Sequence, residues 1–263
     1  MSGAVFEVDG EVCVPTPIAR AGWYEDALHG GPVAALFARA VERVPAVVEM
    51  TVTRLTVDIM RPVPTRPMRV ATRVVRDGRR IQVVEASLLV DDDEMARASA
   101  LRIRSKEVSV PEHPSLPVPP DPEGLAPYRI RQEDGEWFHS RAVEARFVAG
   151  DFYETGPATV WMRLMRPLFA GEEPSPLQRV AALSDFGNGM SRVVPWTWLF
   201  INGDLSVHLL RPAVGEWVCL DSRTDLAGGI GLAQSRLFDH QGLVGHALQG
   251  LLIEAPKEAD TAG

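Results

Sequence analysis

The stretch "FINGDLSVHLLRP", Phe200–Pro212, repeats a pattern that the chain has already used in "TRLTVDIMRP", Thr53–Pro62. Both stretches place apolar side chains at alternate positions and end in Arg-Pro. Such alternation predicts a β-strand with one buried face. The same strand is therefore written twice, which indicates that a longer unit has been duplicated within the chain.

The duplication covers two segments of similar length. The first copy spans Leu55–Ile103 and the second spans Leu205–Ile253. Arg61 aligns with Arg211 at an offset of 150, and the offset falls to 149 further along. Each copy contains three alternating segments separated by turn residues, followed by a short closing strand. This spacing predicts about four antiparallel strands in each copy.

One helical pattern precedes each set of strands. The first lies in Gly31–Pro45 and the second in Ser175–Gly187, and both contain the letters "VAAL". Apolar residues at helical spacing give the first segment one buried face. A short strand is expected ahead of each helix. One helix and one curved sheet bury little surface alone, so the second copy supplies the missing packing partner.

A proline-rich segment separates the two copies. Lys106–Pro127 holds seven of the chain's 21 prolines, a composition typical of a stiff, irregular connector. We therefore expect an N-terminal half at residues 1–105, a connector at 106–127 and a C-terminal half at 128–263 that carries the candidate catalytic residues. The fold class is α+β, with an antiparallel sheet wrapped around a central helix in each half.

This order of elements resembles the double-hotdog thioesterase-like superfamily, which includes the acyl-CoA thioesterase II enzymes. The resemblance extends over nearly the whole chain. It is carried by "HGGPVAALFARA" in the first half, and by "NGDLSVHLLRP" and "ALQGLL" in the second. It implies two tandem hotdog folds and an acyl thioester substrate.

The two copies differ in polarity at three aligned positions. In each, the first copy has an apolar residue and the second a polar one: Ala38 and Asp185, Val52 and Asn202, and Ala100 and Gln249. Polar groups beside a core cost free energy unless they are hydrogen-bonded. A residue needed only for the fold should tend to occur in both copies. We therefore expect a polar cluster that only the second half needs.

The resemblance gives this cluster a role. In the resembled thioesterases an Asp on the second helix, a Ser or Thr two residues before an Asp on the next strand, and a Gln on the last strand hold one attacking water. Asp185 matches the first position and Gln249 the third, whereas Asn202 replaces the hydroxyl ahead of Asp204. An amide can still hydrogen-bond. We take Asp185, Asn202 and Gln249 as candidate catalytic residues and Asp204 as a candidate substrate-binding residue, with a simple ion pair as the alternative for Asp204.

Strand geometry raises a difficulty for Asn202. Successive side chains of a strand point to opposite faces, so Asn202 and Leu205 lie on opposite faces of an unbroken strand. If the leucine face covers the helix, Asn202 points away from Asp185. A β-bulge at Gly203 would turn Asn202 inward. Alternatively, the site lies where the strand leaves the helix.

The first helix is preceded by "HGG", His29–Gly31. Two glycines at a helix start let a substrate approach the backbone closely, and free N–H groups at the positive end of the helix suit a carbonyl oxygen. His29, Gly30 and Gly31 are therefore candidate substrate-binding residues. The alternative is a structural turn with Pro32 at the first helical position, with His29 itself structural.

Composition excludes several other classes of protein. The chain has 263 residues, a net charge of -8 and a pI near 5.3, which argues against a nucleic-acid partner. Two cysteines form no disulfide framework. The N-terminus has no leader pattern, and the longest apolar run is too short to span a membrane. We expect a cytoplasmic protein.

Motifs of other enzyme chemistries are missing. The sequence has no G-x-S-x-G elbow, no dinucleotide loop after a strand, no hydratase loop motif with paired Asp and His, and no metal-ligand spacing. No cofactor or metal is therefore expected. The arginines Arg76, Arg79 and Arg80 either meet coenzyme A phosphates or form a solvated hairpin.

The sequence therefore predicts an acyl-CoA thioesterase that uses an activated water and no covalent intermediate. One alternative is a catalytically weak protein that binds acyl thioesters on the same fold, which the replacement at Asn202 favours. Another is a structural assembly module that keeps only the fold. Exposed sheet edges predict a homodimer or larger homo-oligomer.

Overall fold

The computed structural model describes residues 3–22, 24, 26–109, 111, 114–128 and 137–256. The three regions expected at 1–105, 106–127 and 128–263 each include a few positions outside these ranges. Those boundaries stay a prediction.

The described strands form one continuous 13-stranded antiparallel sheet in the order β1-β2-β4-β5-β6-β3-β10-β13-β12-β11-β8-β7, with β9 paired to β13. The first half supplies β1 (Phe6–Asp9), β2 (Val12–Pro15), β3 (Met50–Ile59), β4 (Met68–Arg76), β5 (Ile81–Val90) and β6 (Asp93–Arg104). The second supplies β7 (Val143–Ala149), β8 (Ala158–Leu164), β9 (Leu199–Asn202), β10 (Asp204–Leu209), β11 (Val218–Ala227), β12 (Ile230–Asp239) and β13 (Gly242–Glu254). The two halves join where β3 pairs with β10.

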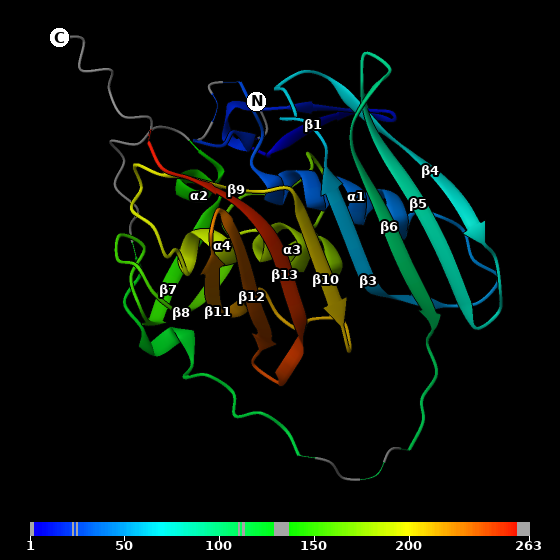
Figure 1. Ribbon diagram of the computed structural model, residues 1–263. Helices are drawn as coiled ribbons and strands as arrows, with labels where there is room; N and C mark the ends of the chain where they lie inside the picture. The colour runs from blue at the N-terminus through cyan, green and yellow to red at the C-terminus, as the bar shows by residue number, and fades with distance from the viewer. Residues whose placement is uncertain are drawn as a thin grey trace.

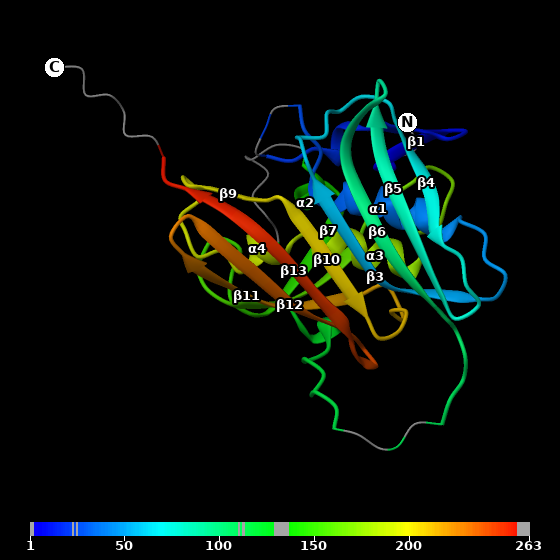
Figure 2. The same ribbon diagram turned by 45° about the vertical axis from the view of Figure 1, so that its right-hand side comes forward.

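The sheet curves around two central helices, one from each half (Figures 1 and 2). The described helices are α1 (Gly30–Glu42), α2 (Phe138–Arg141), α3 (Pro176–Ser184) and α4 (Gly187–Met190), with short 3-10 turns η1 (Pro17–Ala19) and η2 (Pro122–Gly124). The two long helices, α1 and α3, pack against each other. This arrangement confirms the predicted α+β fold of two tandem hotdog units, and it places the core between the helices and the concave face of the sheet.

Helices α1 and α3 run antiparallel. At one end, the Glu42 carboxylate at the end of α1 accepts hydrogen bonds from Ser175 Oγ at 2.7 Å and Gln178 Nε2 at 3.0 Å at the start of α3. Ser175 also caps α3, because its hydroxyl accepts the Gln178 N–H. At the other end, the N-terminus of α1 meets the C-terminus of α3, so Gly30 lies beside Asp185.

Both helices end earlier than the sequence predicts. Helix α1 stops at Glu42 rather than near Pro45, because the residue before a proline is disfavoured in the helical conformation. Helix α3 stops at Ser184, and a separate turn of helix, α4, begins at Gly187. The interruption falls at Asp185.

A bulge shifts the strand register at the same place in both halves. Asn202 pairs with Leu251 while Ser206 pairs with Leu248, so one extra residue lies between them on the β9–β10 side. In the first half the register of β3 against β6 shifts between Val52 and Arg54. The bulge considered at Gly203 is therefore present, and it has a counterpart at Thr53.

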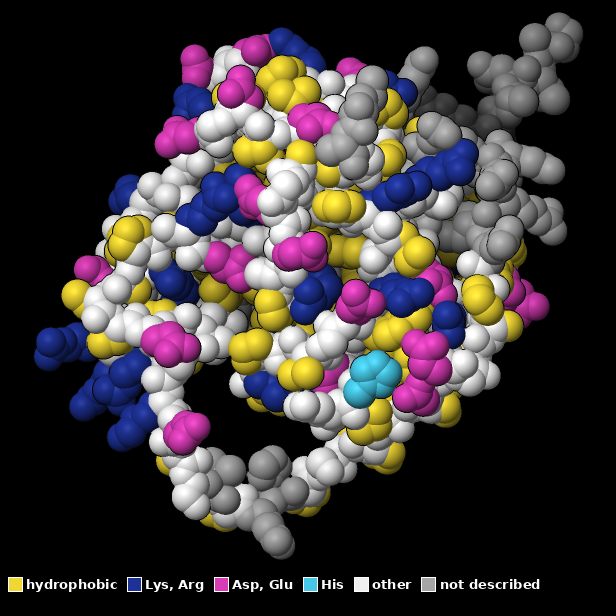
Figure 3. Space-filling model, turned by 180° about the vertical axis from the view of Figure 1, so that it is seen from behind, with side chains coloured by type: hydrophobic (Ala, Val, Ile, Leu, Met, Phe, Trp, Pro, Cys, Tyr) yellow, Lys and Arg dark blue, Asp and Glu magenta, His cyan; other side chains and the backbone are white. Residues whose placement is uncertain are grey.

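The connector between the halves leaves β6, bows away from the body of the molecule and returns at η2 (Figures 1 and 3). It is fixed at its far end, where the Trp161 Nε1–H donates to Pro120 O at 2.7 Å. Its path keeps it away from the concave face of the sheet.

Candidate active site

Asp185 stands at the interruption between α3 and α4. It is the C-cap of α3, with φ -68° and ψ -14°, and it is only 5% exposed. A buried carboxylate needs several hydrogen-bond donors to stay charged. The surroundings of Asp185 supply such donors from three separate parts of the chain.

The Asp185 carboxylate contacts both residues that were predicted to share the catalytic role with it, Asn202 and Gln249. Its Oδ1 accepts from Asn202 Nδ2 at 2.9 Å and from Gln249 Nε2 at 3.2 Å. Its Oδ2 lies 2.9 Å from His29 Nδ1, which comes from the other half of the molecule. Segments far apart in the sequence thus converge on one carboxylate.

Gln249 is fixed from both ends of its amide. It is 1% exposed on β13, and its Oε1 accepts the Asn188 N–H at 3.1 Å while its Nε2 also donates to Asp185 O at 3.2 Å. A Cβ on Gly187 would lie 3.0 Å from Gln249 Oε1 and 2.7 Å from Ser235 Oγ. Glycine at 187 therefore lets α4 sit directly on this polar part of the sheet.

Asn202 reaches Asp185 because of the bulge at Gly203. Its Nδ2 donates to the Asp185 carboxylate and also to Asp204 O, at 3.1 Å. Both amide hydrogens are therefore used in holding the site together. The amide oxygen is the part of this side chain that these bonds leave available.

His29 presents one nitrogen to two partners. Its Nδ1 accepts the Gly31 N–H at 3.1 Å, as the N-cap of α1, and the same atom lies 2.9 Å from Asp185 Oδ2. Without a proton, Nδ1 can accept from Gly31, and with a proton it can donate to Asp185. The position of one proton thus links the helix cap to the carboxylate.

The two glycines of "HGG" have different surroundings. A Cβ on Gly30 would lie 2.6 Å from Asp185 Oδ1, whereas a Cβ on Gly31 would collide with the backbone oxygen of Ala182. The Gly31 N–H is used by His29. Among the described residues none accepts a hydrogen bond from the Gly30 N–H. Gly30 is therefore the glycine that can offer an N–H to a ligand, and Gly31 allows the two helices to pack closely.

Asp204 lies away from this centre. Its Oδ1 accepts the Gly250 N–H at 2.6 Å, which ties β10 to β13 just after the bulge. The carboxylate is thus engaged with the backbone of the sheet, as a structural residue would be.

A cavity of about 710 Å³ opens beside Asp185. Of the predicted site residues, His29, Gly30, Asp185 and Asn202 line it. Gln249, Gly31 and Asp204 are not among the lining residues, so Gln249 acts on the cavity only through Asp185 and Asn188. Polar groups of both halves, His29 and Gly30 from the first and Asp185 and Asn202 from the second, therefore meet in the lining of one cavity.

Sequence reasoning missed most of the cavity wall. Aromatic residues of the second half contribute much of the lining, namely Trp137, His139, Phe152, Tyr153, Phe186, Trp196 and Phe200. Aliphatic residues, mostly of the first half, also line the cavity, including Leu28, Val33, Ile59, Met60 and Val63. The available signal was the pair of tryptophans in "VVPWTW", residues 193–198, which have no counterpart in the first copy.

His139 is a half-buried histidine among the lining residues. Its ring centroid lies 6.3 Å from that of His29. Burial, and next the charge of His29, lower the pKa of His139 to about 3. The ring is therefore neutral at physiological pH, and it contributes to the wall as an aromatic surface.

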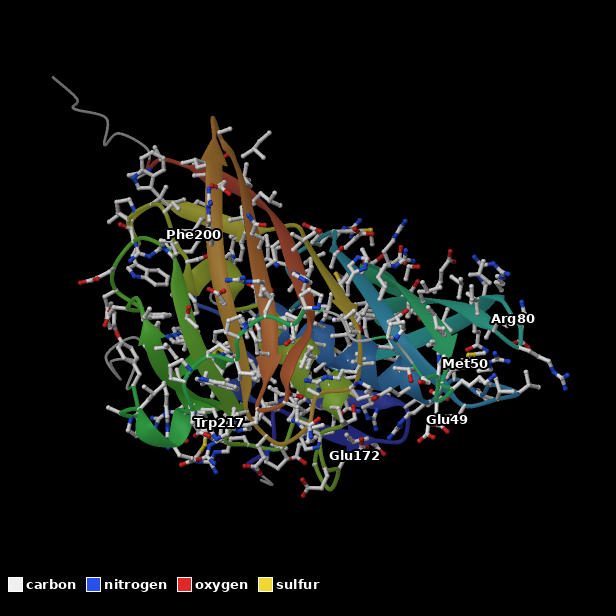
Figure 4. All side chains as sticks on the ribbon, turned by 90° about the horizontal axis from the view of Figure 1, so that it is seen from below. Glu49, Met50, Arg80, Glu172, Phe200 and Trp217 are labelled. Atoms are coloured by element: carbon white, nitrogen blue, oxygen red, sulfur yellow. The ribbon has the colours of Figure 1, made fainter. Side chains whose placement is uncertain are left out.

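The arginine cluster at the β4–β5 turn does not reach the cavity. Arg80, in that turn, and Phe200, in the cavity wall, lie at opposite ends of the molecule (Figure 4). Arg76, Arg79 and Arg80 are not among the lining residues, so a contact with coenzyme A phosphates and a solvated hairpin both stay predictions for them.

The described ranges contain no group of three or more His, Cys, Asp or Glu side chains placed to hold a metal ion. Within the same ranges, no helix is both long enough and apolar enough to cross a membrane.

Solved structures share this architecture over nearly the full chain. A conserved protein with a hot dog fold from Alicyclobacillus acidocaldarius has 18% identity and a TM-score of 0.76, with 97% of each chain covered. A putative thioesterase II from Thermobifida fusca has 18% identity and a TM-score of 0.72, with 96% of each chain covered. The acyl-CoA thioesterase II TesB2 from Mycobacterium marinum has 17% identity and a TM-score of 0.68, with 95% of each chain covered. These likenesses define the class as a tandem hotdog protein.

The family is shown by two sequence models. The model of the acyl-CoA thioesterase N-terminal domain matches residues 19–103, and that of the C-terminal domain matches residues 112–253. The chain belongs to the acyl-CoA thioesterase family. No curated protein matches it in sequence.

Proposed function

We propose that the protein is an acyl-CoA thioesterase that hydrolyses an acyl thioester with a water activated by Asp185. The observation that carries the proposal is a buried carboxylate at the wall of a cavity, held by Asn202, Gln249 and His29. Membership of the acyl-CoA thioesterase family supports the substrate class.

In the proposed reaction Asp185 acts as general base. Two amides occupy its Oδ1, so Oδ2, on the His29 side, is the oxygen that takes the proton of the attacking water. The water oxygen bonds to the carbonyl carbon, the carbon–sulfur bond breaks, and the proton held by Asp185 passes to the departing sulfur. The products are the free acid and the thiol.

The start of α1 is suited to the carbonyl oxygen. The Gly30 N–H lies at the positive end of a 13-residue helix, beside the carboxylate. A backbone donor and a helix N-terminus both stabilise the negative charge that develops on that oxygen. Gly30 and Asp185 would thus act on opposite sides of the reaction, one on the carbonyl and one on the water.

Asn202 changes how the carboxylate is held. A hydroxyl can donate only one hydrogen, whereas this amide donates to both Asp185 Oδ1 and Asp204 O. We assign Asn202 the task of orienting Asp185, with its amide oxygen as a possible acceptor for the water. Gln249 orients the same carboxylate from the side of the sheet.

The test is hydrolysis of an acyl-CoA panel, followed by release of free thiol. Asp185→Asn keeps the shape and removes the base, so turnover should fall by at least about 100-fold, the lower end of what general-base assistance contributes. KM should change little. The matched control is Asp58→Asn, the same change at an exposed carboxylate on β3, which should keep parental turnover.

The second candidate function is acyl-thioester binding with little catalysis. It is favoured by the two amide donors on Asp185 Oδ1, which leave only one carboxylate oxygen to meet an attacking water. If the parent protein binds an acyl-CoA in calorimetry but releases no thiol, this second function replaces the first. If Asp185→Asn hydrolyses at the parental rate, the role of Asp185 as general base is overturned.

We further propose assembly as a homodimer or larger homo-oligomer. Strands β1 and β7 end the sheet on its two sides, and unpaired edges invite pairing or coverage by a second copy. Light scattering at micromolar concentration should give at least twice the mass of one chain. A monomer under those conditions would count against the proposal.

A further inference from the structure

The aromatic side chains of the cavity form a continuous row that starts next to Asp185. From His29 the ring centroids follow at 6.3 Å to His139, 6.0 Å to Phe152, 4.9 Å to Trp196 and 5.3 Å to Phe200. His139 and Phe152 are nearly parallel, at 28°. All five line the cavity. The row therefore leads from the candidate catalytic carboxylate along one wall.

Apart from His29, all rings of the row come from the half that carries the polar cluster. Phe200 aligns with Met50 of the first copy, and the two lie well apart in Figure 4. The first-half loop at 43–49 reads "RVPAVVE", without an aromatic residue, where the second half reads "VVPWTW" at 193–198. Both halves build the same fold. The aromatic rings are therefore not what the fold requires.

The charges of the cavity indicate which part of a thioester meets this row. Among the described lining residues, Arg61 is the only arginine or lysine, and it lies with Met60 and Pro62 from the first half. Arg192 lies over the Trp196 ring at 4.6 Å, but its guanidinium donates to the backbone oxygens of Val194, Tyr153 and Glu154. The aromatic row thus has no cation directed to a phosphate, which suits an uncharged acyl group.

We propose that the aromatic row is the acyl-binding wall and that it selects thioesters whose acyl group carries an aromatic ring. An aromatic ring bound here can stack on Phe152 or Trp196 in offset or edge-to-face geometry, a gain beyond area burial that an alkyl chain lacks. The aliphatic residues Val33 and Ile59 also line the cavity, but they offer a bound ring no aromatic surface. This inference rests on the proposed thioesterase function, whose substrate class it narrows.

The experiment compares two thioesters with equal numbers of acyl carbons, phenylacetyl and octanoyl, each joined to N-acetylcysteamine. This small thiol lacks adenine and phosphates, so any preference comes from the acyl group. We expect kcat/KM to favour the phenylacetyl ester by about tenfold, the upper size of one aromatic contact. If the two N-acetylcysteamine esters are hydrolysed with equal kcat/KM, the row does not select an aromatic acyl group and the proposal is overturned.

The variants locate the preference. Trp196→Leu and Phe152→Leu should each lower kcat/KM for the phenylacetyl ester by about tenfold while the octanoyl ester changes less than twofold. Trp196→Phe keeps a ring and should restore most of the preference. Met60→Leu, at an aliphatic lining residue outside the row, is the matched control and should not change the preference. A loss that is equal for both esters, or one that Trp196→Phe does not rescue, overturns the proposal.

A binding measurement separates this inference from the proposed function. Calorimetry with Asp185→Asn should show the phenylacetyl ester binding about tenfold more tightly than the octanoyl ester. If the parent protein hydrolyses both esters at equal rates, thioesterase activity stands and the aromatic selection fails. If it hydrolyses neither, the proposed function fails, and the binding ratio alone decides the inference, with equal affinities overturning it.

Discussion

The central helix of the first half continues through Ala38, whereas that of the second half stops at Asp185 and resumes at Gly187. The interruption leaves the Asn188 N–H outside the main helix, and Gln249 Oε1 accepts it at 3.1 Å. In the first half the residue aligned with Gln249 is the fully buried Ala100. The helix break and the glutamine therefore go together. The break frees the Asn188 N–H, and the buried Gln249 Oε1 accepts it, so each group satisfies the other.

The strand bulge, unlike the helix break, is present in both halves. It occurs at Thr53 and at Gly203, so the backbone turns both Val52 and Asn202 toward the helices. Only the side chain differs. The backbone geometry of the candidate site therefore belongs to the fold and occurs twice, while the polar chemistry occurs once.

The arginines of the shared Arg-Pro motif, Arg61 and Arg211, also have different surroundings in the two halves. Arg211 makes a bidentate ion pair with the fully buried Asp239, at 2.5 and 2.6 Å. Its counterpart Arg61 has no side-chain partner among the residues described and lines the cavity. Identical letters in the two copies therefore do not mark identical roles.

The largest effect on stability should come from Arg211→Ala. It leaves Asp239 buried with only backbone donors, which should lower the free energy of unfolding by about 3 kcal/mol, the lower end for a broken buried pair. Arg61→Ala should lower it by less than about 0.5 kcal/mol. Urea unfolding of both variants measures the difference, and equal losses would show that the two arginines are equivalent.

The same pair should govern part of the acid sensitivity. Burial alone would raise the pKa of Asp239, but hydrogen bonds from Arg211 and from the Val214 and Gln241 N–H groups outweigh it and lower the pKa overall. A lowered carboxyl pKa stabilises the fold above the unfolded value of about 3.9, and this stabilisation is lost as pH falls through the folded value. The difference in free energy of unfolding between the parent protein and Arg211→Ala should therefore become smaller below about pH 4.

The next effect concerns the two glycines at the start of α1. In Gly30→Ala the new Cβ displaces the Asp185 side chain, and a misplacement near 1 Å can lower turnover by about 100-fold. In Gly31→Ala the Cβ meets the backbone oxygen of Ala182, so the melting temperature should fall instead. Parental turnover in a folded Gly30→Ala protein would contradict the proposed role of Asp185.

Ala100→Ser and Ala38→Ser test whether the first-half counterparts of Gln249 and Asp185 take part in catalysis. Each adds a hydroxyl at a fully buried position, which should lower the free energy of unfolding by about 1 kcal/mol. Turnover should stay within about twofold of the parent, because neither position faces the cavity. A well-folded Ala100→Ser protein without activity would refute the functional asymmetry of the halves.

The smallest effect is expected for Asn202→Thr, which restores the hydroxyl of the resembled family at the same bulge. Hydrolysis of a good acyl-CoA should rise or stay unaltered, because the hydroxyl can still donate to Asp185 while giving up the second bond to Asp204 O. A tenfold loss of turnover would show that the amide of Asn202 is required in this protein.

The sequence alone determined the duplication, the order of the strands and helices, and the three positions where the second copy turns polar. These features follow from periodicity and turn residues, which report which face of a segment is buried. They also suggested a bulge at Gly203. Strict alternation along one strand would turn Asn202 away from Asp185, and a bulge removes that conflict.

Only the tertiary structure decided which groups meet. It placed His29 of one half against Asp185 of the other, interrupted the second helix at Asp185, put Gly31 against Ala182 and Asp204 against Gly250, and lined the cavity with aromatic rings. These contacts join segments more than 40 residues apart in several cases, and they depend on how α1 and α3 pack and how β3 and β10 register. Local sequence patterns specify the buried face of each element, but the close packing of separate elements selects the neighbour of each side chain.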